Sequence, residues 1–99
     1  MSKQFEIIVI DDLEDYHVEK VEGTPINIRG FENFTFFVHE RMDKWVVSEK
    51  LSGAKVTAYE DSKGKAIKEA IRILKKAGII RLREVIKQSM KHKRQAKNR

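Results

Sequence analysis

The spacing of apolar residues changes at Asp61, and this change constrains the fold more than any other feature of the chain. Before Asp61 apolar side chains recur at every second position, as in Phe5, Ile7 and Val9. A period of two places alternate side chains on opposite faces of a strand. After Asp61 they recur at spacings of three and four residues, which is the period of a helix. The chain is therefore expected to form strands first and helices second.

Strand-like runs fill the first half of the chain. They combine alternation with β-branched and aromatic residues, which favour strands. The runs cover residues 5–10, 16–21, 34–39, 45–47 and 56–59. Turn-forming residues separate them at Gly23–Pro25, Arg41–Lys44 and Ser52–Gly53. The last three runs are therefore expected to form a three-strand antiparallel meander.

The run 34–39 has the strongest alternation. One face carries Phe34, Phe36 and Val38, and the other carries Thr35, Phe37 and His39. We interpret the aromatic residues of this run as core and cross-strand contacts rather than as platforms for stacked bases.

Helical periodicity begins after a capping residue, because Asp61 or Ser62 can accept a hydrogen bond from the amides of the first turn. The first apolar stripe consists of Ala66, Ile67, Ala70, Ile71, Leu74 and Ala77. Gly78 is typical of the residue that ends a helix. A second stripe consists of Ile79, Leu82, Val85, Ile86 and Met90. Since almost nothing apolar follows, the second helix is expected to pack at its start and to emerge into solvent at its end.

These elements predict an α+β fold, in which an antiparallel meander sheet is packed by one or two C-terminal helices. A chain of 99 residues has room for one core, so we expect a single domain over residues 1–90 and a basic extension of the last helix over 91–99. The absence of cysteine excludes disulfides, thiolate metal sites and thiol nucleophiles. No run resembles a signal peptide or a membrane span, which predicts a cytoplasmic protein without membrane contact.

Charge is divided unevenly along the chain. Residues 1–60 hold seven basic and twelve acidic residues, whereas residues 61–99 hold fourteen basic and three acidic residues. The two parts therefore have formal net charges of −5 and +11. Such asymmetry favours contact between the basic part and a polyanion. The alternative is a solvated basic helix that contributes only to solubility.

The residues that could support catalysis or bind a metal are scattered. His39 and Glu40 are neighbours on a strand, so their side chains point to opposite faces. His17 and Glu19 share a face, but we interpret this pair as solvated surface rather than a metal site. We therefore predict a protein that is not an enzyme and has no cofactor and no metal site.

Lysines crowd the first turns of the first predicted helix. Cations at a helix start oppose the helix dipole, so they are unfavourable there unless an anion approaches. Phosphate groups are the commonest such anion. Together with the basic end of the chain, this predicts a set of nucleic-acid-binding residues: Lys63, Lys65, Lys68, Lys91, Lys93, Arg94, Lys97 and Arg99.

The segment from Phe34 to Gly78 supports a resemblance. With Trp45-Val46-Val47 opening its second strand, it resembles small phage or prophage proteins of unassigned role. Its order of three strands and a helix is also similar to the N-terminal modules of phage-type integrases. That likeness implies DNA contact by the sheet face that carries Thr35, Phe37, Val46 and Lys55. The helix is similar to the last helix of double-stranded-RNA-binding domains, which implies phosphate contact by Lys63, Lys65 and Lys68.

These observations lead to two hypotheses about function. The first is a small non-enzymatic phage-type accessory protein that binds DNA or RNA through backbone phosphates with its basic C-terminal helices. The second is a protein interaction module of a phage or mobile element, which acts on a host or virion protein through an exposed sheet edge or through the acidic segment Asp11–Glu22. Self-association through the edge strand is a further expectation.

Overall fold

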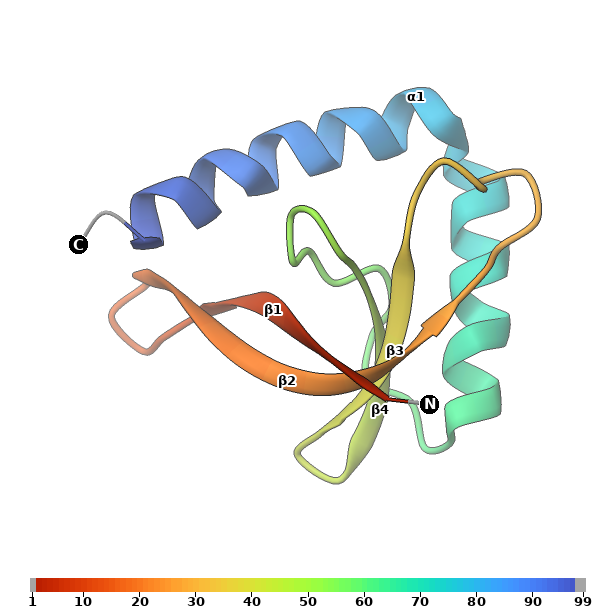
Figure 1. The fold of residues 1–99 in the computed structure, drawn as a ribbon, viewed down its shortest axis with the longest axis horizontal. Coiled ribbons are helices and arrows are strands. Elements are labelled where there is room, and N and C mark those ends of the chain that lie inside the picture. Colours follow the sequence, from red (N-terminus) through yellow and green to blue (C-terminus); the bar gives the residue numbers. More distant parts are fainter. Residues whose placement is uncertain (1, 98–99) are drawn as a thin grey trace.

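A four-stranded antiparallel sheet and one long helix make up the fold in the computed structural model, which describes residues 2–97. The strands follow one another in the order β1-β2-β3-β4, as a meander, and the helix lies after them in the chain (Figure 1). The elements are β1 (Lys3–Ile10), β2 (Tyr16–Ile26), β3 (Phe36–Arg41), β4 (Lys44–Glu49) and α1 (Lys63–Lys97). The predicted α+β class is confirmed.

β2 is the long strand that joins the two halves of the sheet. Its residues 16–23 pair with β1, and its residues 24–26 pair with β3. The turn predicted at Gly23–Pro25 is therefore wrong, because the strand continues through it. Pro25 is accommodated because β1 begins opposite Gly23, so within residues 2–97 Pro25 pairs with β3 only. At such an edge the amide proton that proline lacks is not needed.

The hairpin between β3 and β4 is confirmed. Arg41 pairs with Lys44, and the two loop residues, Met42 and Asp43, both have positive φ, at 53° and 61°. Such a loop is a type I′ turn, whose twist suits a two-residue hairpin. The strand predicted over 56–59 is wrong. That segment instead runs antiparallel beside β4 and is joined to it by two isolated bridges, Lys55 with Ser48 and Glu60 with Trp45.

The two faces of β3 have different cores, as its alternation predicted. Phe36 and Val38 join the main core beneath α1. On the other face, the ring of Phe37 stacks on the ring of Phe5 with a centroid separation of 4.0 Å. The β1–β2 hairpin therefore curls over this face. Phe37 and Val46 are buried, so they do not form the open DNA-reading surface that the integrase resemblance implied.

α1 consists of two arms that meet at Gly78, where φ is 82° and ψ is 169°. Figure 1 shows the first arm, residues 63–77, beside the sheet, and the second arm, residues 79–97, which bends sharply from the first and runs back above the β1–β2 hairpin. The predicted cap is Ser62, whose Oγ accepts a hydrogen bond of 3.2 Å from the amide of Lys65. Asp61 forms an ion pair with Lys44 instead.

The second arm packs along more of its length than expected. Leu82 and Ile86 are buried in the main core, as the second apolar stripe predicted. Farther on, the ring of His92 stacks on Tyr16 with a centroid separation of 4.1 Å. The expected emergence into solvent is therefore wrong for this part of the arm. Within residues 2–97 no helix is long and apolar enough to span a membrane.

Candidate nucleic-acid interface

The predicted lysines of the first arm lie at the start of α1 and have different surroundings. The ammonium group of Lys63 lies 6.0 Å from the centroid of the Trp45 ring. Nζ of Lys65 lies 3.8 Å from a carboxylate oxygen of Glu60. Lys68 is exposed, and no ion pair of it is found within residues 2–97. Of these three lysines, Lys68 therefore has the most freedom to meet an external anion.

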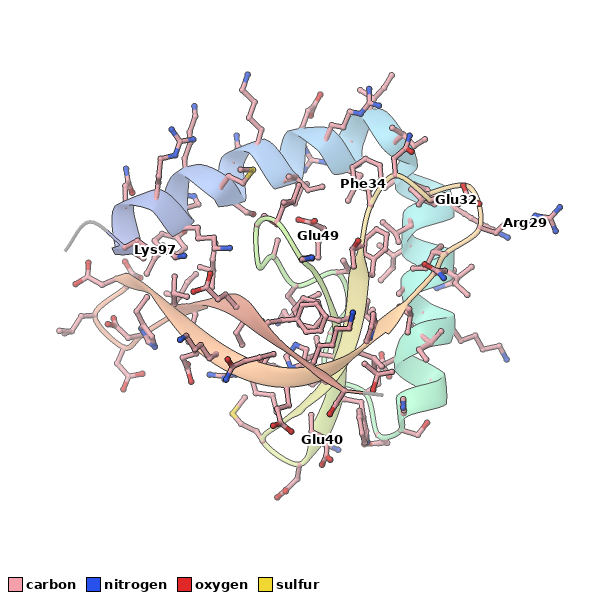
Figure 2. All side chains as sticks on the ribbon, viewed as in Figure 1. Arg29, Glu32, Phe34, Glu40, Glu49 and Lys97 are labelled. Atoms are coloured by element: carbon pink, nitrogen blue, oxygen red, sulfur yellow. The ribbon has the colours of Figure 1, made fainter. Side chains whose placement is uncertain are left out.

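Two predicted lysines of the second arm turn toward the sheet. Nζ of Lys97 lies 2.8 Å and Nζ of Lys93 lies 3.4 Å from the same carboxylate oxygen of Glu6. The hydrogen bond from Lys97 is the main cause that lowers the pKa of Glu6, and the charge of Lys93 adds to it. Lys93 also donates a hydrogen bond of 3.0 Å to the carbonyl oxygen of Leu51. These lysines therefore hold the arm to β1, and Figure 2 shows Lys97 on the side of α1 near the β1–β2 hairpin.

Lys91 and Arg94 lie on another side of the same arm, together with two cations that the sequence reasoning did not name. The four side chains are exposed, and within residues 2–97 none of them forms an ion pair. Their spacings of four, four and three residues place them on one face of a helix. We call this set the basic stripe: Arg83, Lys87, Lys91 and Arg94.

The basic stripe spans eleven residue steps, which corresponds to about 16 Å along a helix. Nitrogen-tipped side chains stand along the side of the second arm that faces away from the sheet in Figure 2. Two other arginines of α1 form ion pairs, Arg72 with Glu69 at 2.8 Å on the first arm and Arg81 with Glu84 at 3.3 Å on the second. The basic stripe has no such pairs within residues 2–97 and is therefore a line of uncompensated positive charge.

The structure does not bring the predicted set together at one place. The lysines near the start of α1 and the cations near its end lie at opposite ends of a bent helix (Figure 1). Arg99 lies outside the described residues. Arg83 and Lys87 could have been found from the sequence by extending the spacing of Lys91 and Arg94 backward in steps of four residues.

Two of the histidines, His17 and His39, make local hydrogen bonds. Nε2 of His39 lies 3.1 Å from the hydroxyl oxygen of Ser48, and Nδ1 lies 3.3 Å from the backbone oxygen of Glu40. Burial is the main cause that lowers the pKa of His39. His17 contacts Glu19 at 3.3 Å, and that carboxylate also binds Arg41 at 3.0 Å. Within residues 2–97 no group of three or more potential ligands is placed to hold a metal ion.

Comparison with known proteins identifies no relative of this chain. No family model matches it. Neither the curated proteins nor the solved structures contain a match.

Proposed function

We propose that this chain is a small non-enzymatic accessory protein, of the kind found in phages, that binds nucleic acid through backbone phosphates. The basic stripe is the observation that carries the proposal. Its four cations are exposed and form no ion pair within residues 2–97, whereas Lys93 and Lys97 on the same arm share an ion pair with Glu6. Cations that have no internal partner gain most from an external polyanion, because neutralising phosphates releases condensed counterions.

The dimensions of the basic stripe suit a phosphate backbone. Phosphates follow one another along one strand of a duplex at about 3.4 Å of axial rise, so a stripe of about 16 Å faces roughly five of them. No aromatic residue lies in the stripe. Contacts to phosphate position a protein on a duplex but carry no sequence information. Binding is therefore expected to tolerate any base sequence.

Salt dependence gives the sharpest test of this proposal. Fluorescence anisotropy would be measured with duplex DNA, single-stranded DNA and duplex RNA at several salt concentrations. If the stripe neutralises four phosphates, the slope of log affinity against log salt for duplex DNA should be roughly −3 to −4. Replacing the four stripe residues with glutamine should remove most of this slope.

A matched control removes the same amount of charge elsewhere. Four exposed cations outside α1, for which no ion pair is found within residues 2–97, serve this purpose: Lys3, Lys20, Arg29 and Lys50. Replacing them with glutamine should leave the slope nearly unchanged. Equal loss in both variants would show that net charge alone is responsible, and no binding at about 50 mM salt would overturn the proposal.

The second hypothesis, a protein interaction module, is also supported by a specific observation. β1 is the first strand in the order of the sheet, so within residues 2–97 one of its edges has no neighbouring strand. An exposed strand edge is a common site for adding a partner strand.

A further inference from the structure

A groove lies beside the C-terminal half of β1. Its volume is about 480 Å³, within the range of roughly 300 to 1,000 Å³ that is usual for ligand sites. The curled β1–β2 hairpin forms one wall, and the segment after β4 forms the other, with Lys55 and Tyr59. Residues of β3 and β4 lie between these walls, among them Val46.

The groove lies at the edge of β1 rather than over one of its faces. Four consecutive residues of the strand, Ile7, Ile8, Val9 and Ile10, line it. Consecutive side chains of a strand point to opposite faces, so a cavity on one face would be lined by alternate residues only. The groove therefore lies where a further strand beside β1 would run.

The backbone of β1 is only partly paired at this edge within residues 2–97. Antiparallel pairing alternates, and the hydrogen bond of 2.9 Å from the amide of Asp11 to the carbonyl of Asp15 places the odd-numbered residues in the bonded set with β2. The even-numbered residues therefore direct their backbone groups away from β2. The amide of Ile8 uses this direction to reach the carbonyl of Gly53 at 3.1 Å. Within residues 2–97 the outward amide of Ile10 has no backbone partner.

The rim of the groove is apolar and positively charged. Ile10 is 58% exposed and Met42 is 70% exposed, so two large apolar side chains border it in water. The charge of Arg41 is balanced by Glu19. Lys55 lies over the ring of Tyr59 at 4.5 Å and forms no ion pair within residues 2–97.

We propose that the edge of β1 at Ile8–Ile10 binds an extended peptide segment of a partner protein, which adds to the sheet as a strand. The backbone of the peptide pairs with the outward groups of Ile10. An apolar side chain of the peptide enters the groove, and an acidic side chain lies near Lys55. This surface is separate from the basic stripe, so the inference does not depend on nucleic-acid binding.

The test uses a displayed library of random eight-residue peptides, selected on the full chain. Enriched peptides should alternate apolar residues with others and should carry an aspartate or glutamate at one position. The variant Ile10→Pro removes the outward amide while leaving the pairing with β2 in place, so it should weaken the selected peptides at least tenfold. Ile10→Val is the matched control and should bind them as the parent chain does.

A second variant tests the charge. Selection on Lys55→Glu should replace the acidic position of the enriched peptides with lysine or arginine. Thermal unfolding of each variant checks that the fold is intact. Failure to enrich any peptide would overturn the inference, as would peptides that bind Ile10→Pro and the parent chain equally. If the chain bound a small amphipathic anion more tightly than any peptide, and Ile10→Pro did not change that binding, the groove would be a ligand pocket instead.

Discussion

Glu6 and Lys97 are 91 residues apart in the chain, and their carboxylate oxygen and ammonium nitrogen lie 2.8 Å apart. The same carboxylate contacts Lys93 at 3.4 Å. This cluster joins the first strand to the last described turn of α1. It closes the fold at the end of the second arm, where few apolar side chains remain to pack.

Glu6→Gln should lower the free energy of unfolding by at most about 1 kcal/mol at pH 7, because partly exposed ion pairs contribute little. The pKa of Glu6 is lowered in the folded protein, so its contribution is complete above the usual value of 4.5 and is lost as the pH falls through the lowered value. Denaturant unfolding at pH 7 and at pH 3 checks this. The difference from the parent chain should shrink at pH 3.

Glu22→Gln provides the control for this prediction. Glu22 is an exposed residue of β2, and no ion pair of it is found within residues 2–97. Its replacement should have almost no effect at either pH. An equal effect of both variants would mean that the loss comes from general charge rather than from the contact between β1 and α1.

Deletion of residues 91–99 should lower the thermal midpoint by several degrees. The deletion removes the stacking of His92 on Tyr16 and the hydrogen bond of Lys93 to Leu51. An aromatic stack and a hydrogen bond together contribute about 1 to 3 kcal/mol. Each kcal/mol corresponds to roughly 4 to 8 °C in a domain of this size. Differential scanning calorimetry checks the shift, and an unchanged midpoint would contradict the packing of this arm.

Point variants separate the contacts of that segment. His92→Ala removes the stacking and should lower the midpoint, whereas Lys91→Ala changes an exposed residue of the basic stripe and should leave it nearly constant. For salt-dependent nucleic-acid binding we expect the reverse, because Lys91→Ala should weaken it and His92→Ala should leave it nearly unchanged. Equal effects of the two variants would contradict the division of the second arm into a side that packs on Tyr16 and a side that carries the basic stripe.

Three glycine substitutions should differ in sign and size. A Cβ at Gly53 would lie 2.9 Å from the backbone of Glu6 and of Ile7, and its φ is +69°. Gly53→Ala should therefore destabilise the fold by more than about 1 to 3 kcal/mol, the usual cost of backbone strain alone. A Cβ at Gly30 would meet no atoms within 4 Å, but φ there is +90°, so the loss of stability in Gly30→Ala should come from backbone strain alone. Gly64→Ala meets open space in a helix and should stabilise it by about 0.5 to 1 kcal/mol.

Equilibrium unfolding of the three variants measures these differences. The order of stability should be Gly64→Ala, then Gly30→Ala, then Gly53→Ala. If Gly53→Ala were no less stable than Gly30→Ala, the close approach of the turn after β4 to β1 would be wrong.

Mild acidification should destabilise the protein through His39. Burial lowers its pKa below the usual value of 6.5, so the unfolded chain takes up a proton at a higher pH than the folded chain. Stability should therefore begin to fall as the pH drops below 6.5. Unfolding between pH 7.5 and pH 5.5 should show a smaller loss for His39→Gln than for the parent chain. An imidazole titration by NMR that gives His39 a pKa at or above 6.5 would contradict the prediction.

Features that depend on neighbours in the chain were predictable from the sequence. The change of period at Asp61 separates the strands from the helix, because side-chain spacing selects the backbone geometry that buries an apolar face. Ser62 and Gly78 mark the start and the bend of α1 through hydrogen bonding and backbone freedom at single positions. The loop Arg41–Lys44 follows in the same way from the alternating runs on either side of it.

Features that depend on distant partners were decided by the tertiary structure. Pro25 remains within β2 because, in the part of the chain that the structure describes, it pairs with Phe37 of β3 and not with β1. Lys93 and Lys97 turn inward while Lys91 and Arg94 turn outward, although all four belong to one basic run. Periodicity can group the residues of a helix into faces. Which face meets Glu6 depends on the bend at Gly78 and on the path of the curled β1–β2 hairpin, because packing between distant segments sets the rotation of the helix about its axis.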